Sequence, residues 1–281
     1  MTVRYWLMVA LVALIGCAPT LSNAATVSCA GVDDTATIQS AIAAGGIVEL
    51  TGGTCRATGI LTMATVNTTV VIDAPVVSTA SPVFRLTAQN VGIIGKARRL
   101  PIVGPGIGIS IEGSISIYLD LFQLNTGGTG IAAVSGAGLW ASRIHMNGTA
   151  GANSSAMRFT QWDTAYLSHI LSEEHDTGVR LGYGNGNVNN IQMTNIILDR
   201  LHATYGQALR VEANPGYQVG NVQSVSLWAS QGYYPVTLIA SQGGMICNIQ
   251  LENSYYTGFT VHAPVFYGNV CNVQDGKALY L

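Results

Sequence analysis

Charged side chains are scarce in this chain. Only 9% of its 281 residues are Asp, Glu, Lys or Arg, whereas an average soluble domain carries roughly 25%. The 12 basic and 14 acidic side chains leave a formal net charge of −2, which creates no overall field that would attract a polyanion. We therefore expect no nucleic-acid partner. The 33 glycines and the low charge suit an all-β fold better than a helical one.

Several motifs of well-known chemistry are also missing. The sequence contains no mononucleotide-binding loop, no nucleophile elbow and no Cys/His spacing of a metal centre. We therefore expect no cofactor and no metal. Calcium alone stays open, near Glu173, Glu174 and Asp176, because carboxylate oxygens are its usual ligands.

The apolar run at the N-terminus, Trp6–Ile15, is too short to span a bilayer. Because Arg4 precedes it, residues 1–25 are predicted to be an export signal, and residues 26–281 a single domain. The protein is then exported, to the periplasm, the outer membrane or the medium.

Two ways of processing this signal stay open. Leu14–Cys17 resembles a bacterial lipobox, in which Cys17 would become the lipidated first residue. Ser22–Ala24 is a small-x-small site for ordinary signal peptidase. A membrane contact is expected only through a lipid anchor at Cys17, and the oligomeric state stays open.

One short motif, Asn followed by an aliphatic residue and Gln, recurs through the last third of the chain. Its copies begin at Asn190, Asn221, Asn248 and Asn272, at intervals of 31, 27 and 24 residues. Weaker copies precede them at Asn90, Ser114, Gly138 and Thr164. A period of 20 to 50 residues is typical of a solenoid.

Two further sets of apolar positions repeat beside this motif. A third strand is expected around Ile144, Ile170, Ile196 and Leu227. Apolar–variable–apolar triplets, which suit half-buried strands, begin at Phe84, Ile109, Ile131, Met157, Val179, Leu209, Val236 and Phe259. Three short strands per turn, stacked about 4.8 Å apart, predict an all-β, single-stranded parallel β-helix.

The cysteines fit this stacking. Cys247 and Cys271 each stand one residue before a repeated Asn, in adjacent turns. Their Cα atoms should lie about 5 Å apart, within disulfide range. We predict a Cys247–Cys271 bond, the alternative being two stacked free thiols. Cys29–Cys55 then follows by elimination, and both bonds require an oxidising compartment.

The segment after the signal predicts a cap. Asp33 or Asp34 can begin a short helix whose apolar face contains Ile38, Ala41 and Ile42, and Gly45-Gly46 can end it. A helix in this place would cover the open end of the solenoid.

This segment also carries a family resemblance. Asp-Asp-Thr-Ala-Thr-Ile-Gln-Ser-Ala-Ile at 33–42, Gly-Gly-Ile-Val-Glu-Leu at 45–50 and Gly-Gly-Thr-Cys-Arg at 52–56 resemble the start of pectate-lyase-superfamily proteins. That group has a right-handed parallel β-helix and includes secreted polysaccharide lyases, hydrolases and phage tailspikes. The resemblance implies the same fold and a polysaccharide ligand. It does not extend to the catalytic motifs of the polygalacturonase-like members, because Asn125-Thr126-Gly127 lacks their acid and the chain has no Arg-Ile-Lys.

Candidate catalytic residues come from counting positions between turns. Glu173 and Asp199 should lie on adjacent turns with carboxyls roughly 5 Å apart, as in a retaining glycosidase. His169 is a candidate general base, and Arg143 on the neighbouring turn could hold a uronate carboxylate, as a lyase would require. The alternative for all four is an ordinary solvated outer surface.

Candidate binding residues occupy two outward columns. Trp140 and Tyr166 should stack as a flat platform for sugar rings, although simple packing explains them equally well. Arg158, Arg180 and Arg210 should lie on successive turns. Their mutual repulsion calls for acids such as Glu212 or Asp176, or for a polyanionic glycan.

Two functions remain. One is an exported glycoside hydrolase or polysaccharide lyase with its groove on the middle turns. The other is a non-catalytic surface β-helix that binds a cell-surface glycan or mediates adhesion. The fold by itself does not choose between them.

Overall fold

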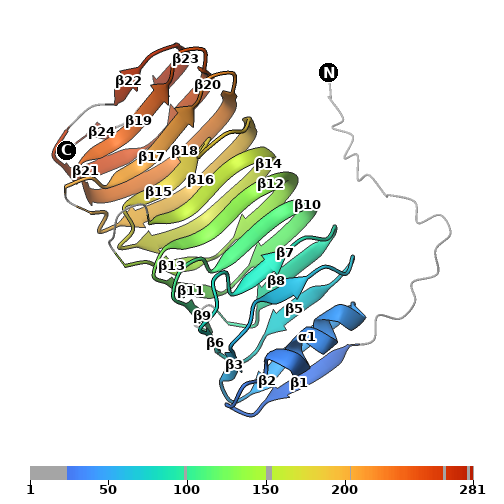
Figure 1. The fold of residues 1–281 in the computed structure, drawn as a ribbon. Helices are drawn as coiled ribbons and strands as arrows, with labels where there is room; N and C mark the ends of the chain where they lie inside the picture. Colours follow the sequence, from blue (N-terminus) through green and yellow to red (C-terminus); the bar gives the residue numbers. More distant parts are fainter. Residues whose placement is uncertain are drawn as a thin grey trace, which may run out of the picture.

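The computed structural model describes residues 24–97, 100–149, 154–202, 204–261, 264–276 and 279–280. The chain forms a parallel β-solenoid of about nine turns, with 64% of residues in strands and 4% in helix. Figure 1 shows the turns stacked along one axis, with the first turns beside α1 and the last beside β22 and β23. The predicted fold class is confirmed. Residues 1–23 of the predicted signal, with the lipidation site at Cys17, lie outside the described residues, and its last residue, Ala25, begins β1.

Three parallel sheets run along the axis, and several long strands curve from one sheet into the next. The first sheet contains β1 (Ala25–Cys29), β2 (Ile47–Gly52), β5 (Thr69–Ile72), β8 (Val91–Gly95), β10 (Ile109–Asp120), β12 (Thr129–Ser142), β14 (Ser155–Glu173), β16 (Val188–Asp199), β18 (Gln218–Gly232), β20 (Met245–Glu252) and β23 (Val270–Gly276).

The second sheet contains β3 (Cys55–Ala57), β6 (Val76–Ser78), β9 (Pro101–Gly104), β11 (Gln123–Thr126), β13 (His145–Asn147), the ends of β14, β16 and β18, then β21 (Tyr255–Phe259) and β24 (Leu279–Tyr280). The third contains β4 (Leu61–Met63), β7 (Phe84–Leu86), the starts of β10, β12 and β14, then β15 (Thr177–Leu181), β17 (Gln207–Ala213), β19 (Tyr234–Ala240) and β22 (Val265–Tyr267).

The core is a set of aliphatic columns inside the solenoid. In the first sheet one column is fully enclosed and runs through Val91, Ile117, Leu139, Ala165, Ile191, Val222 and Ile249. Neighbouring side chains in a column are one inter-strand spacing apart, about 4.8 Å, so each buries apolar area against the turns before and after it.

The corner before the first sheet explains the repeated asparagines. A residue with positive φ stands directly before each position of this column, at Asn67, Asn90, Ser116, Gly138, Thr164, Asn190, Asn221, Asn248 and Asn272. The column residue is Thr68 after Asn67 and an aliphatic residue after the others. Asn tolerates this left-handed conformation better than most residues. The side-chain amides also bond along the column, Asn272 Nδ2 donating to Asn248 Oδ1 at 2.6 Å and Asn248 Nδ2 to Asn221 Oδ1 at 3.1 Å.

Two predicted positions were wrong. The corner member in β10 is Ser116 and not Ser114, because Ile117, fully buried, pairs with Leu139. The last predicted triplet, which begins at Phe259, is also in the wrong place. The strand that pairs with β19 is β22, and Phe259 is the last residue of β21.

Helix α1 (Thr35–Ala44) covers the first turn as predicted, and Ile38 and Ile42 are its buried residues. Gln39 substitutes for a missing neighbouring strand: its Nε2 donates to Thr62 O at 2.9 Å, and Thr62 N donates to its Oε1 at 2.7 Å. The cap therefore pairs with the β4 backbone that the solenoid would otherwise leave open.

Both predicted disulfides are present. Cys29–Cys55 and Cys247–Cys271 join adjacent turns with Cα–Cα distances of 4.8 and 4.7 Å. They are compatible with an exported protein. Among the described residues, no helix has the length and apolar character needed to cross a membrane.

Candidate functional site

Three aromatic rings stack on the outer surface of the first sheet, and we call them the aromatic ladder: Tyr118, Trp140 and Tyr166. The Tyr118 and Trp140 centroids are 5.0 Å apart with planes 11° from parallel, and those of Trp140 and Tyr166 are 5.8 Å apart at 16°. The residues are 48%, 38% and 40% exposed. Three nearly parallel rings therefore form one apolar strip that stays open to solvent.

The backbone register produces the ladder. Each ring follows a buried aliphatic residue of the same column, and Tyr118, Trp140 and Tyr166 are direct Cα partners. The prediction that Trp140 and Tyr166 stack is confirmed, whereas Tyr118 was missed because the corner was placed at Ser114. The column continues through Gln192, Gln223, Gln250 and Gln274.

Polar groups border the ladder two residues further along each strand. Ser168 Oγ donates to Ser142 Oγ at 3.1 Å. Asp120 pairs with Arg143, whose Nε donates to Asp120 Oδ1 at 2.9 Å, while the second guanidinium contact goes to Oδ2. This hydrogen-bonded carboxylate raises the pKa of Arg143. The arginine proposed to hold a uronate thus already has a carboxylate partner within the chain.

His169 stands at a second corner with positive φ, directly after Ser168. Its ring is exposed, and Asn195 Nδ2 lies 3.4 Å from its Nε2. Arg143 occupies the same corner one turn earlier. Arg143 and His169 therefore lie at the same corner of neighbouring turns, as predicted, but the Arg143 side chain is paired with Asp120 rather than with His169.

Glu173 and Asp199 are direct Cα partners in adjacent turns, as the position count predicted. Arg200, which the sequence reasoning did not consider, occupies the surface beside them. It forms ion pairs with Glu173 and, at 2.7 Å, with Glu174. Asp199 accepts hydrogen bonds from Ser230 Oγ and from the Arg200 backbone N–H. The two carboxylates are thus held by protein partners.

The histidine nearest these acids in the sequence, His175, is enclosed. Burial lowers the pKa of His175 to about 4, and Ser172 Oγ lies 2.9 Å from its Nδ1. A neutral ring sealed from solvent has a packing role.

Asp176 is buried too and accepts a hydrogen bond from Ser154 N at 3.0 Å. No group of three or more His, Cys, Asp or Glu side chains in the described ranges could hold a metal ion, so calcium finds no support there.

The third sheet carries the arginine stack, which consists of Arg158, Arg180 and Arg210. They are direct Cα partners on successive turns, as predicted. Glu212 is the acid that pairs with two of them, Arg180 Nε to Oε2 at 2.7 Å and Arg210 Nη2 to Oε1 at 2.6 Å. Burial alone would raise the pKa of Glu212, but its hydrogen bonds and charge contacts with Arg180 and Arg210 outweigh burial and lower it.

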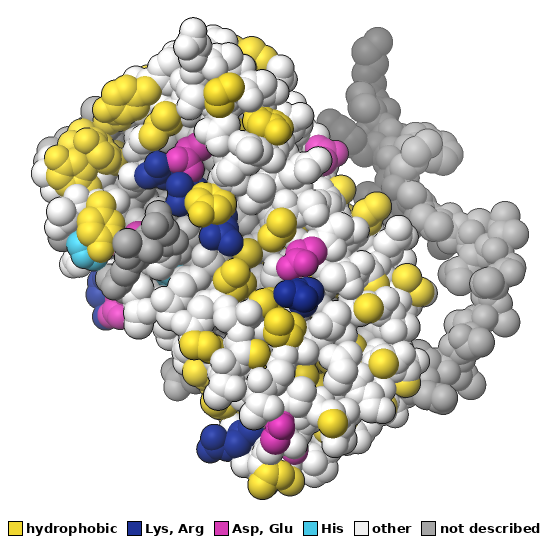
Figure 2. All heavy atoms as spheres, in the orientation of Figure 1, with side chains coloured by type: hydrophobic (Ala, Val, Ile, Leu, Met, Phe, Trp, Pro, Cys, Tyr) yellow, Lys and Arg dark blue, Asp and Glu magenta, His cyan; other side chains and the backbone are white. Residues whose placement is uncertain are grey.

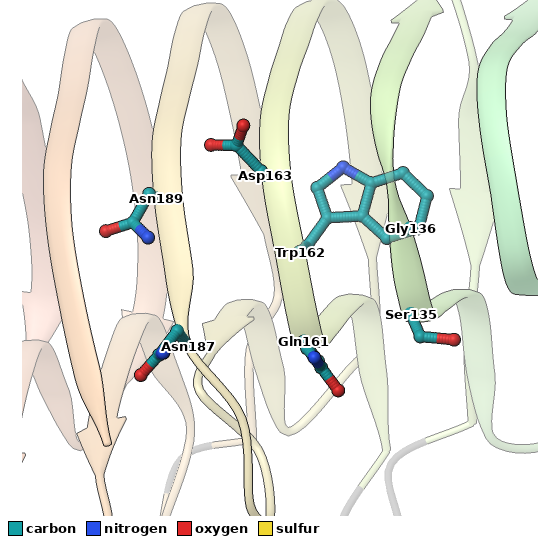
Figure 3. A pocket seen from close by; sticks show the side chains of 7 residues that line it. All are labelled: Ser135, Gly136, Gln161, Trp162, Asp163, Asn187 and Asn189. Carbon is teal, nitrogen blue, oxygen red and sulfur yellow. The ribbon is translucent and has the colours of Figure 1, made fainter. Parts of the chain in front are cut away.

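A shallow pocket of about 350 Å³ lies between these two surfaces, on the strand segments just before the asparagine corner. Figure 3 shows the indole of Trp162 lying across Gly136 of the neighbouring turn, with Asp163 and Asn189 on one side and Gln161 and Asn187 on the other. A Cβ on Gly136 would lie 2.2 Å from the Ser114 carbonyl oxygen and 2.9 Å from the indole, so the position requires glycine. The lining is polar, but Trp162 itself is buried and forms only the floor.

The protein is therefore a parallel β-solenoid with an exposed aromatic ladder on its first sheet. At the sequence level the chain matches no protein-family model and no curated protein. Among solved structures it is similar to the A-module of the Azotobacter vinelandii mannuronan C-5 epimerase AlgE6, at 13% identity and a TM-score of 0.26, over 89% of this chain and 96% of that one.

A second solved structure, ORF18 of Geobacillus virus E2, is similar at 11% identity and a TM-score of 0.26. The match covers 89% of this chain and 61% of the phage protein. TM-scores of this size say nothing about the activity of this chain. Its function has to be inferred from the residues on its own surface.

Proposed function

We propose that this protein is an exported β-solenoid that binds a polysaccharide on the outer surface of its first sheet. The aromatic ladder is the observation that carries the proposal. A strip of three exposed, nearly parallel rings offers a flat apolar surface to the C–H faces of sugar rings. Ser142, Ser168 and the Gln column beside and beyond the strip supply hydrogen-bonding groups for hydroxyls.

The direction of the ladder favours a linear polymer. The rings repeat along the solenoid axis at the strand spacing, and Gln192 and Gln223 continue the same column. A chain lying along this axis would contact aromatic rings on one part of the surface and amides on the next. A compact ligand would use only one of these parts.

Removing the central ring tests the proposal. We expect Trp140→Ala to weaken retention on a matched polysaccharide about tenfold, equivalent to ~1.4 kcal/mol, measured by affinity electrophoresis against a panel of neutral and uronate polymers. Tyr267→Ala is the control, because Tyr267 is also an exposed aromatic residue but lies on β22, outside the ladder. Equal losses in both variants, or no retention of the wild-type protein on any polymer, would contradict the proposal.

Cleavage is the second candidate function, supported by the adjacency of Glu173 and Asp199. The same panel tests it through reducing ends and through absorbance of unsaturated uronates. Reducing ends without new absorbance, abolished by Glu173→Gln, would indicate a hydrolase. New absorbance would indicate a lyase and would direct attention to His169 and Arg143. Retention without release of any product is the result expected for a binding protein.

A further inference from the structure

The arginine stack has more positive charge than its protein partners neutralise. Figure 2 shows basic side chains gathered on this face of the solenoid, with acidic atoms next to them. Arg158, Arg180 and Arg210 contribute three positive charges, and Glu212 contributes one negative charge through both of its oxygens. The local sum is 3 − 1 = +2, in a protein whose overall formal charge is −2.

Arg158 accounts for the imbalance. Its guanidinium carbon lies 4.5 Å from the centroid of the Tyr183 ring, and that of Arg180 lies 4.3 Å from the same centroid. Within the part of the chain that the structure describes, the ion pairs of this stack join Glu212 only to Arg180 and Arg210. Tyr183 therefore orders the Arg158 guanidinium without neutralising it.

Burial makes this free charge unfavourable. It lowers the pKa of Arg158, and the charge of Arg180 lowers it further, while Tyr183 acts in the opposite direction. Nε of Arg210 is also buried and finds no hydrogen-bond acceptor in the described part of the chain. Partly buried cations and unused donors are stabilised when an anion supplies both charge and acceptor oxygens.

We propose that Arg158, Arg180 and Arg210, ordered by Tyr183 and Glu212, form a binding site for a tetrahedral oxyanion, a sulfate or phosphate group. The charge supports this class, because a phosphate group carries about −1.5 to −2 at neutral pH, close to the +2 of the stack. The geometry supports it too, since guanidinium groups donate in a planar fork that matches such oxyanions. The site lies on the third sheet and is independent of the aromatic ladder on the first.

The chain offers a matched control for this site. Arg85 belongs to the same column of the third sheet, because Arg85 pairs with Ser110, Ser110 with Ala132, and Ala132 with Arg158. Unlike Arg158, Arg85 has an acid partner, Glu112, at 3.3 Å. Removing either side chain takes one positive charge from the same face, but only Arg158→Gln removes an unpaired one.

The experiment measures binding of inorganic sulfate and phosphate to the protein by calorimetry, with sodium chloride at the same ionic strength as the reference. We expect binding to the wild-type protein, at least a tenfold loss in Arg158→Gln, and wild-type affinity in Arg85→Gln. Arg158→Lys should retain part of the affinity, since it keeps the charge but loses the fork. Absence of oxyanion binding to the wild-type protein, or equal affinity in Arg158→Gln, would overturn the proposal.

Two further arms separate the sources of the oxyanion. Tighter binding of a hexose 6-sulfate or 6-phosphate than of the inorganic ion would identify a modified glycan as the ligand, and equal binding would identify the free ion; both support the site. Binding of a polyuronate that depends on Arg158, without any sulfate or phosphate binding, would overturn the tetrahedral assignment. Trp140→Ala should leave oxyanion binding unchanged, so this proposal and the proposed function can fail separately.

Discussion

At the scale of single residues, the corners show why particular side chains recur. Asn221, Asn248 and Asn272 combine a left-handed backbone with an amide that bonds along the column. Thr164 has a similar positive φ, and Asp163 beside it accepts the Asn190 amide at 2.8 Å. The conformation is therefore the constant feature of the corner, and Asn is the residue that satisfies it while adding a hydrogen bond.

The carboxyl group of Asp33 has a pKa well below its ordinary value. Its carboxylate accepts hydrogen bonds from the side chains and backbone N–H groups of Thr35 and Thr58, so it links the start of α1 to the turn after β3. These bonds, led by that from the Thr35 hydroxyl, lower the pKa of Asp33 from 3.8 to about 2. The carboxylate therefore stabilises the folded state in its ionised form.

We predict that Asp33→Asn changes the acid dependence of stability. A depressed folded-state pKa gives a contribution that is complete above about pH 4 and is lost as pH falls toward 2. The variant should be less stable than the wild type at pH 7, with the two melting temperatures converging between pH 4 and 2. Thr58→Val should show a smaller version of the same convergence. Parallel melting curves across this range would show that Asp33 does not act in this way.

At the scale of elements, each turn depends on its neighbours through strand register. A displacement of one residue would exchange the inner and outer faces, but a displacement of two preserves the alternation. Ser114-Ile115 and Ser116-Ile117 have the same pattern, and only the second places its isoleucine in the core. Because of this ambiguity the corner was predicted at Ser114 instead of Ser116, and Tyr118 was not predicted to belong to the aromatic ladder.

The disulfides should stabilise the two ends of the solenoid separately. We predict that the double substitution Cys247→Ala/Cys271→Ala costs about 3 kcal/mol, the chain-entropy value for a loop of this order. Because each turn contacts only its neighbours, the loss should be confined to β20, β21 and β23. Hydrogen exchange by mass spectrometry measures this directly.

The matched control is Cys29→Ala/Cys55→Ala at the opposite end, which should loosen β1, β2 and β3 and leave the last turns protected. Uniform loss of protection along the whole chain in either variant would contradict separate stabilisation of the ends.

At the scale of the whole molecule, the solenoid needs protection at its first turn. Helix α1 supplies it with Ile38 and Ile42 in the core and with the paired Gln39 amide against β4. Open strand edges otherwise pair with other chains. The cap is therefore expected to control association as well as stability.

We predict that Ile38→Asp, which places an unpaired charge in the core, lowers the free energy of unfolding by about 3 kcal/mol or more. The same variant should associate in a concentration-dependent way, detected by sedimentation velocity, because the first turn loses its cover. Ser40→Asp on the exposed side of α1 is the control and should stay within about 0.5 kcal/mol of the wild type. A stable, non-associating Ile38→Asp protein would show that the cap is dispensable.

The solenoid, its cap and both disulfides could be predicted from the amino-acid sequence alone. Alternation and period predicted the solenoid and the Cys247–Cys271 bond, whose cysteines are one regular turn apart. The Cys29–Cys55 bond followed by elimination, and the cap followed from local helix signals. The same counting correctly placed Glu173 beside Asp199 and Trp140 beside Tyr166.

Which side chains remain available to a ligand could be seen only in the folded molecule. Arg143 pairs with Asp120 and Arg200 with Glu173, while Arg158 lies beside Tyr183 and has no acid partner among the described residues. Long charged side chains reach diagonal neighbours in adjacent turns, and the turn lengths that set those diagonals vary along the chain. A period read from the sequence gives the column of a residue, but its partner is decided by the local register and by the reach of its side chain.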